Sequence, residues 1–271
     1  MDVITTLFSY SFVTRAVVVG ILVSLCSSVL GVSLVLKRYS MIGDGLSHVS
    51  FGALAIAAAL NMAPLAVSIP IVIASAFFIL RLSSNSSIGG DSAIAIFSSA
   101  ALAIGIIITS MTKGINADIC NYMFGSILAM SESDVLISII LSVVVLVLYM
   151  LFYNRIFAIT FDESFSRATG IRVNAYNMTI AVLTAVTIVI GMRIMGALLI
   201  SSLIIFPALS AMQVCRFFKR VILTSAIISV FCFLGGIITS YLLEVPVGAS
   251  VVVVNLCVFL IFSFIKKLRQ L

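Results

Sequence analysis

An all-α bundle that crosses a membrane many times is the fold that this sequence predicts, and both its composition and its charge placement indicate this. Apolar residues make up 63% of the 271 residues, and charged residues only 9%. The mean hydropathy of +1.35 exceeds what a water-soluble domain of this length sustains. We therefore expect one transmembrane domain over residues 1–271, a polytopic bundle of about 8–9 helices.

The uncharged runs are long enough for nine crossings, since a helix needs about 20 residues to span about 30 Å of hydrocarbon. The stretch 42–80 is interrupted at 61–64 and has room for two crossings. Segment 117–130 is too short to span comfortably, so we expect it to be re-entrant or interfacial. The clear crossings are 16–36, 92–112, 135–153, 174–192, 194–215, 221–243 and 245–265.

Charge placement predicts the orientation of the chain. If 117–130 does not cross, 12 of the 15 basic residues fall on one side, and Arg15, Lys113 and Arg193 fall on the other. The positive-inside rule then favours nine crossings with an external N-terminus and a cytosolic C-terminus. The net charge of +6 thus reflects contact with the membrane lipid and gives no reason to expect nucleic acid as a partner.

Several missing motifs exclude enzyme classes. No glycine-rich nucleotide-binding loop is present, so any use of ATP requires another subunit. One histidine cannot supply a His-Glu-x-x-His zinc protease motif, and no Gly-x-Ser-Gly turn of the rhomboid protease type occurs. The five cysteines are scattered without metal-ligand spacing, which is typical of packing residues. We expect neither an enzyme nor a permanently bound cofactor.

Asp44 and His48, the single histidine, stand out at the start of an apolar run. In a helix this spacing of four places both side chains on one face, close enough to hold one cation. Titratable groups inside a membrane segment are costly and usually functional. Two other readings remain open: Asp44 could complement the dipole at a helix N-terminus, and His48 could be a hydrogen-bonded packing residue.

A second candidate region is the hydrophilic stretch from about residue 160 to 172, called here the coupling segment. Asp162 and Glu163 begin it, Arg167 follows, and Gly170 is a stop signal, which together predict a short surface helix. Such a helix could be a solvated loop. It could also dock on a cytosolic partner and receive ATP-driven motion.

Four ordered motifs resemble the permease subunits of bacterial zinc, manganese and iron ABC importers. The first is a Gly-Asp-x-x-Ser-His motif, the second lies in the coupling segment, and the third and fourth are Gly-x-Leu-Leu … Pro-Ala and Ser-Tyr-x-x-acid-x-Pro-x-Gly. The match extends over essentially the whole chain. The motifs occupy residues 37–48 with Gly52, residues 161–163 with 168–171, residues 191–211, and residues 240–248.

The resemblance implies the compact helical fold of metal and cobalamin importers, in a bacterial inner (plasma) membrane. It also implies a homodimer with two cytosolic ABC ATPase subunits and an extracytoplasmic metal-binding protein. Asp44 and His48 would then line the path, Asp162, Glu163, Arg167 and Gly170 would couple to the ATPase, and Glu244 would be a further ligand. Glu244 departs from the aspartate common in the family, and it could instead be a loop acid before Pro246.

Carboxylate and imidazole ligands together suit Zn²⁺, Mn²⁺ and Fe²⁺. Zinc is the favoured cargo, with manganese or iron as alternatives. The orientation places Asp44 and His48 towards the cytosol and Glu244 near the outside, so we favour successive stations over one shared shell. The alternative function is an ion-coupled secondary carrier or channel in which Asp44 and His48 relay protons.

Overall fold

The computed structural model describes residues 11–85, 90–112 and 132–270, and every regular element in these ranges is a helix. The predicted re-entrant segment 117–130 lies outside the described residues. The helices are α2 (Ser11–Leu36), α3 (Ile42–Ala59), α4 (Pro64–Asn85), α5 (Gly90–Met111), α7 (Glu132–Leu151), α8 (Tyr153–Phe161), α9 (Glu163–Ala168), α10 (Val173–Met195), α11 (Ala197–Val214), α12 (Phe218–Leu243) and α13 (Val247–Gln270).

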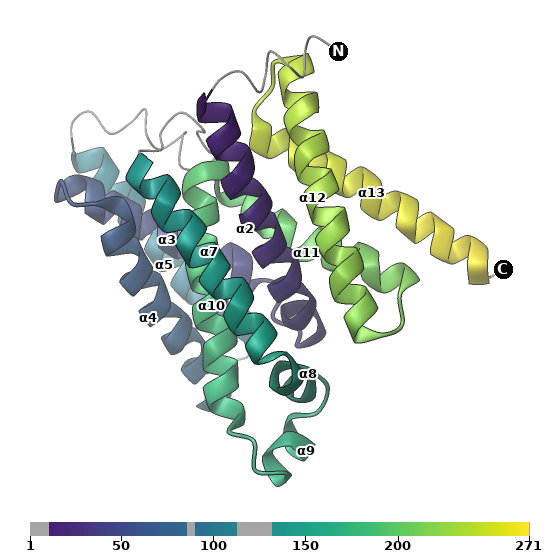
Figure 1. Ribbon diagram of the computed structural model, residues 1–271. Coiled ribbons are helices and arrows are strands. Elements are labelled where there is room, and N and C mark those ends of the chain that lie inside the picture. The colour runs from purple at the N-terminus through teal and green to yellow at the C-terminus, as the bar shows by residue number, and fades with distance from the viewer. Residues whose placement is uncertain (1–10, 86–89, 113–131, 271) are drawn as a thin grey trace.

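Nine helices in the described ranges are long and apolar enough to cross a membrane, as the sequence predicted. They are α2, α3, α4, α5, α7, α10, α11, α12 and α13, whereas α8 and α9 are short. Figure 1 shows α8 and α9 together at one end of the bundle, opposite the end where α2 begins. The predicted all-α, polytopic fold is therefore confirmed.

The helices divide into a buried centre and a lipid-facing periphery. In the membrane-spanning stretches of α2 and α3, 72% of the residues are buried, against 17% in α5 and 22% in α13. Helix α2 packs against α7, α10, α11 and α12, which places it at the centre of the bundle (Figure 1). The exposed apolar side chains of the outer helices are those expected to face acyl chains.

Most predicted breaks fall where the structure has them, with two differences. Helix α10 continues through Arg193 and ends at Gly196, whose φ of 83° is readily adopted only without a side chain. Arg193 lies in the last turn of α10, where a cation complements the helix dipole. The second difference is at the C-terminal end of α7. The predicted crossing 135–153 extends too far, because α7 stops at Leu151 and Tyr153 begins α8.

Ion pairs account for two basic residues that violate the predicted charge asymmetry. Arg15 lies 2.7 Å from Glu132, and Arg193 lies 2.8 Å from Asp134. Both acids belong to the first turn of α7, so these contacts tie α7 to the N-terminal end of α2 and the C-terminal end of α10. Lys113, the third exception, lies outside the described residues.

Candidate functional site

Asp44 and His48 lie on one face of α3, as their spacing predicted. The His48 Nε2 and Asp44 Oδ2 atoms are 3.7 Å apart, and the two side chains are 26% and 47% exposed. Most other residues of α3 are buried, including Leu46 and Ser47 between them and Val49 directly after them. The pair therefore forms a polar, partly open stripe on an otherwise buried helix.

Close packing holds α3 in place behind this stripe. A Cβ atom on Gly45 would lie 2.3 Å from the Ile94 side chain, and one on Gly52 would lie 2.6 Å from the Ala101 carbonyl oxygen. Both neighbours belong to α5, so α3 and α5 touch at backbone level. Ser47 donates its hydroxyl to the Asp44 carbonyl at 2.7 Å, which satisfies this buried polar side chain within the helix.

Glu244 lies elsewhere, at the turn between α12 and α13. It is the C-cap of α12 with a φ of 53°, an uncommon conformation for a residue with a side chain. The Ser240 hydroxyl donates to the Val245 carbonyl at 2.6 Å, and the Val245 amide donates back to the Ser240 carbonyl at 3.2 Å. These bonds give the Ser-Tyr-x-x-acid-x-Pro motif a structural role in closing the turn.

The structure does not bring Glu244 into one cluster with Asp44 and His48. Asp44 lies in the first turn of α3, just after the turn from α2, whereas Glu244 is the C-cap of α12. Figure 1 shows that α12 ends at the opposite end of the bundle from the α8 and α9 end, where α2 ends. Within the described residues, no group of three or more His, Cys, Asp or Glu side chains could hold a metal ion. One chain thus offers a two-ligand pair and a distant acid.

The coupling segment contains the end of α8, then Asp162, and then the short helix α9. Asp162 has extended backbone, and its Oδ1 accepts the Phe165 amide at 2.8 Å, so it is the N-cap of α9. Arg167 lies in the last turn of α9, and Gly170 follows with a φ of 82°. The predicted surface helix is present, but it is shorter than the stretch from residue 160 to 172 suggested.

Sequence reasoning missed two features of this segment. Phe165 is 64% exposed on α9, outside the membrane-spanning helices, and no pattern in the sequence distinguished it from the other phenylalanines. Glu163 forms an ion pair with Lys37 at 2.5 Å, whereas charge placement in the sequence indicates only that Lys37 is one of the 12 basic residues on one side of the membrane. Helical periodicity could not reveal this pair because the partners are far apart along the chain.

The electrostatic environment keeps Glu163 charged. Burial raises the pKa of its carboxyl, but hydrogen bonds from Lys37 and Asn177, together with nearby positive charge, lower it by more. The pKa therefore lies below the ordinary value of a glutamate. At neutral pH this residue is a carboxylate fixed between two donors.

A family model described as the ABC 3 transport family matches residues 9–266. The chain belongs to this family. Membership confirms the resemblance seen in the four motifs, and it makes the chain a multi-pass membrane subunit of a transporter, not an enzyme.

Relatives in this family cover nearly the full chain. It is 28% identical over 269 residues to the manganese import system permease protein ScaB of Streptococcus gordonii, with 99% of this chain and 96% of ScaB covered. It is 28% identical over 252 residues to the zinc uptake membrane protein ZnuB of Haemophilus influenzae, with 93% and 97% covered.

A solved structure of the family has the same fold. In the PsaBC complex of Streptococcus pneumoniae with Fab, the matching chain superimposes with a TM-score of 0.86 at 29% identity, covering 96% of this chain and 94% of that one. This similarity confirms the predicted metal-importer type of helical bundle.

Proposed function

We propose that this chain forms the translocation path of an ATP-driven importer of divalent transition-metal ions in a bacterial inner membrane. The observation that carries the proposal is the Asp44–His48 pair, with 3.7 Å between nitrogen and oxygen on a partly open face of α3. One carboxylate and one imidazole suit zinc, manganese or iron. Two protein ligands also leave most coordination positions open, which favours release of a transported ion.

Zinc is the proposed cargo, with manganese or iron as alternatives. Imidazole favours zinc more strongly than manganese, and His48 contributes half of the pair. The relatives ScaB and ZnuB, named for manganese and zinc, are equally similar to the chain at 28% identity, so similarity does not add to this preference. Glu244 is proposed as a separate ligand near the external mouth, consistent with its distance along the bundle from α3.

The proposed working unit contains two copies of this chain, and each copy forms one transmembrane permease domain. It also contains two cytosolic ABC ATPase subunits, and an extracytoplasmic protein delivers the metal. The coupling segment would dock on the ATPase: Asp162 caps α9, Glu163 and Arg167 lie in its first and last turns, Gly170 follows its C-cap, and Phe165 presents an apolar contact. An exposed aromatic side chain on a cytosolic helix is well suited to a protein–protein contact.

Uptake of metal into proteoliposomes that contain the whole complex tests this proposal. Asp44→Asn and His48→Ala should each reduce uptake of Zn²⁺ strongly without loss of the subunit from the membrane. Asp91→Asn is the matched control, because Asp91 occupies the first turn of the neighbouring helix α5 and should be replaceable.

Two results would count against the proposal. Unchanged uptake in both α3 variants would indicate that the pair is a structural feature of the bundle. Uptake that follows a proton gradient and continues without ATP would instead support the alternative of an ion-coupled carrier, with the pair relaying protons.

A further inference from the structure

A buried lysine connects the coupling segment to the beginning of the candidate site. The Lys37 side chain is only 7% exposed, although it ends in an ammonium group. Its Nζ donates to the Ile159 carbonyl at 3.2 Å, to Glu163 Oε1 at 2.5 Å and to Asn177 Oδ1 at 2.7 Å. The three acceptors match the three donors of an ammonium group, so this buried charge is fully satisfied.

These acceptors come from three different elements. Ile159 belongs to α8, Glu163 is the first residue of α9, and Asn177 lies in α10. Asn177 Nδ2 also donates to Glu163 Oε1 at 3.0 Å, which closes a ring of hydrogen bonds among the three side chains. Lys37 is thus the point at which α8, α9 and α10 meet the end of α2.

A tight turn joins Lys37 to α3 and its metal-binding candidates. The Tyr39 amide donates to the Leu34 carbonyl at 2.9 Å, and the Ile42 amide donates to the Tyr39 carbonyl at 3.1 Å. Arg38, within this turn, has a φ of 61°, so the turn has a defined and uncommon backbone conformation. Asp44 follows in the first turn of α3. A short, hydrogen-bonded turn is therefore all that separates the hydrogen-bond ring around Lys37 from Asp44.

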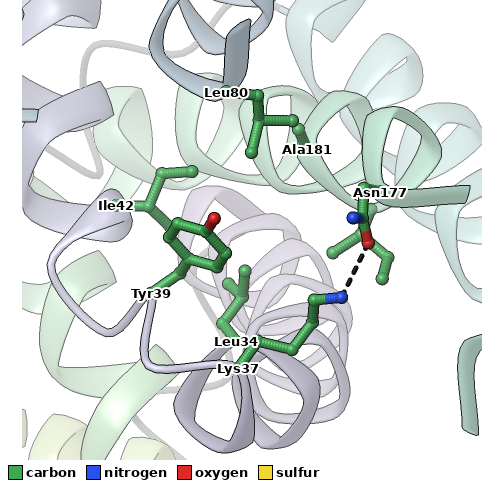
Figure 2. A pocket seen from close by; sticks show the side chains of 8 residues that line it. Leu34, Lys37, Tyr39, Ile42, Leu80, Asn177 and Ala181 are labelled. Carbon is green, nitrogen blue, oxygen red and sulfur yellow. Dashed lines mark hydrogen bonds between the residues drawn. The ribbon is translucent and has the colours of Figure 1, made fainter. Parts of the chain in front are cut away.

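The surroundings of Lys37 favour one arrangement of this ring. Figure 2 shows Lys37 and Asn177 on one side of a small cavity, with Tyr39 and Ile42 on the other. The cavity measures about 20 Å³ and is otherwise lined by aliphatic side chains of α2, α4 and α10: Leu34, Leu80, Ile180 and Ala181. An ammonium group that left the ring towards this side would meet no charged acceptor, which raises the cost of breaking the contacts.

We propose that Lys37 is a positioning residue that transmits movement of the coupling helix α9 to the Asp44–His48 face of α3. A displacement of Glu163 would pull the Lys37 ammonium and, through the α2–α3 turn, the start of α3. This inference rests on the proposed function, in which the ATPase moves α9. A purely structural ion pair would also stabilise the fold, but it would not make the position of α3 depend on the state of the ATPase.

The test measures ATP-dependent movement at the turn in the complete complex with its ATPase subunits. Met41, at the N-cap of α3 and 50% exposed, is replaced by cysteine in a chain whose native cysteines are serines. A maleimide added from the cytosolic side reports its accessibility with and without ATP. We expect ATP to change the labelling rate, and Lys37→Met to abolish the change, whereas Lys37→Arg should retain it because it keeps a charged donor.

Metal uptake provides the second readout. Lys37→Met should reduce uptake by about tenfold or more, within the range of typical coupling free energies. Glu163→Gln, which keeps an oxygen acceptor and loses the charge, should give a smaller reduction. Arg38→Gln is the matched control, since it removes the neighbouring cation and should leave both readouts unchanged. Size-exclusion chromatography of each complex separates a lost connection from failed folding or assembly.

The outcomes distinguish this inference from the proposed function. An ATP-dependent labelling change that survives in Lys37→Met would overturn the positioning role, as would the absence of any such change in the parent complex. If labelling behaves as expected while neither Zn²⁺ nor Mn²⁺ accumulates, the connection stands and the proposed cargo is wrong.

Discussion

In the proposed metal site, His48 would supply a nitrogen ligand and Asp44 an oxygen ligand. An ion that uses both is held by ligands of different preference, because imidazole suits zinc whereas carboxylate also suits manganese. The side chains are only partly exposed, so neither is a freely solvated surface group. The balance between the two ligands should therefore influence which metal is transported fastest.

We expect His48→Ala to lower zinc uptake more than manganese uptake. The remaining carboxylate can still attract either cation, but the ligand that distinguishes them is lost. Competition between radioactive ⁶⁵Zn²⁺ and ⁵⁴Mn²⁺ in the same vesicles would measure the ratio. An equal loss for both ions would argue against direct coordination by His48.

Asp162 has a defined role in the structure, because its side chain caps α9. Asp162→Ala removes the acceptor of the Phe165 amide and should destabilise this short helix by about 1 kcal/mol. Asp162→Asn keeps a capping oxygen and should resemble the parent chain. Hydrogen exchange at the Phe165 amide would show faster exchange in the alanine variant alone. Equal protection in both variants would mean that another group holds the helix.

At the scale of helices, the contact between α3 and α5 depends on residues without side chains. Gly52→Ala would place a Cβ atom 2.6 Å from the Ala101 carbonyl oxygen, which belongs to the backbone and cannot rotate away. Overpacking of this kind costs about 1–3 kcal/mol, so the variant should unfold at a lower temperature and transport poorly.

Gly235 in α12 provides the control for this substitution. A Cβ atom there would meet only Val254 Cγ1 at 3.7 Å, an ordinary contact distance. Gly235→Ala should be neutral or stabilising, because alanine has the higher helix propensity. Thermal unfolding of both variants in detergent checks the contrast, and similar midpoints would contradict the tight α3–α5 contact.

Helix number could be predicted from the sequence because bilayer thickness sets a minimum length for each apolar run. The break between α3 and α4 was also predictable, since Pro64 begins α4. The end of α10 was not, because an arginine between two apolar runs indicates a break, whereas Arg193 continues α10 and pairs with Asp134. Local patterns show which residues favour a helix but not which distant partner neutralises a charge.

The same limit applies to the candidate site. The spacing of Asp44 and His48 predicted one shared face because both lie on one helix. The Lys37–Glu163 contact joins residues from separate parts of the chain, and only the packing of α2 against α8 and α10 brings them together. The acidic start of the predicted helix indicates a role for Glu163, but its partner depends on the fold.

For the whole molecule, the predicted orientation places the α3–α4 turn outside and the coupling segment inside the cell. In a chain without its native cysteines, Met62→Cys and Ser164→Cys provide exposed probes of the two sides. We expect a membrane-impermeant maleimide to label Met62→Cys in intact cells, and Ser164→Cys only after the membrane is opened. The reverse pattern would mean that the positive-inside argument fails for this chain.

The backbone contact between α3 and α5 limits how the candidate site can move. Gly52 and Gly105 bring the two helices too close for side chains to slide past each other, and Phe51 fills the space beside Gly105. Helices α3 and α5 should therefore move as one rigid body, with hinges in the connecting turns. Any stroke that shifts Asp44 then carries the lipid-facing surface of α5 with it, so the stiffness and thickness of the surrounding bilayer become part of the resistance against which ATP hydrolysis works.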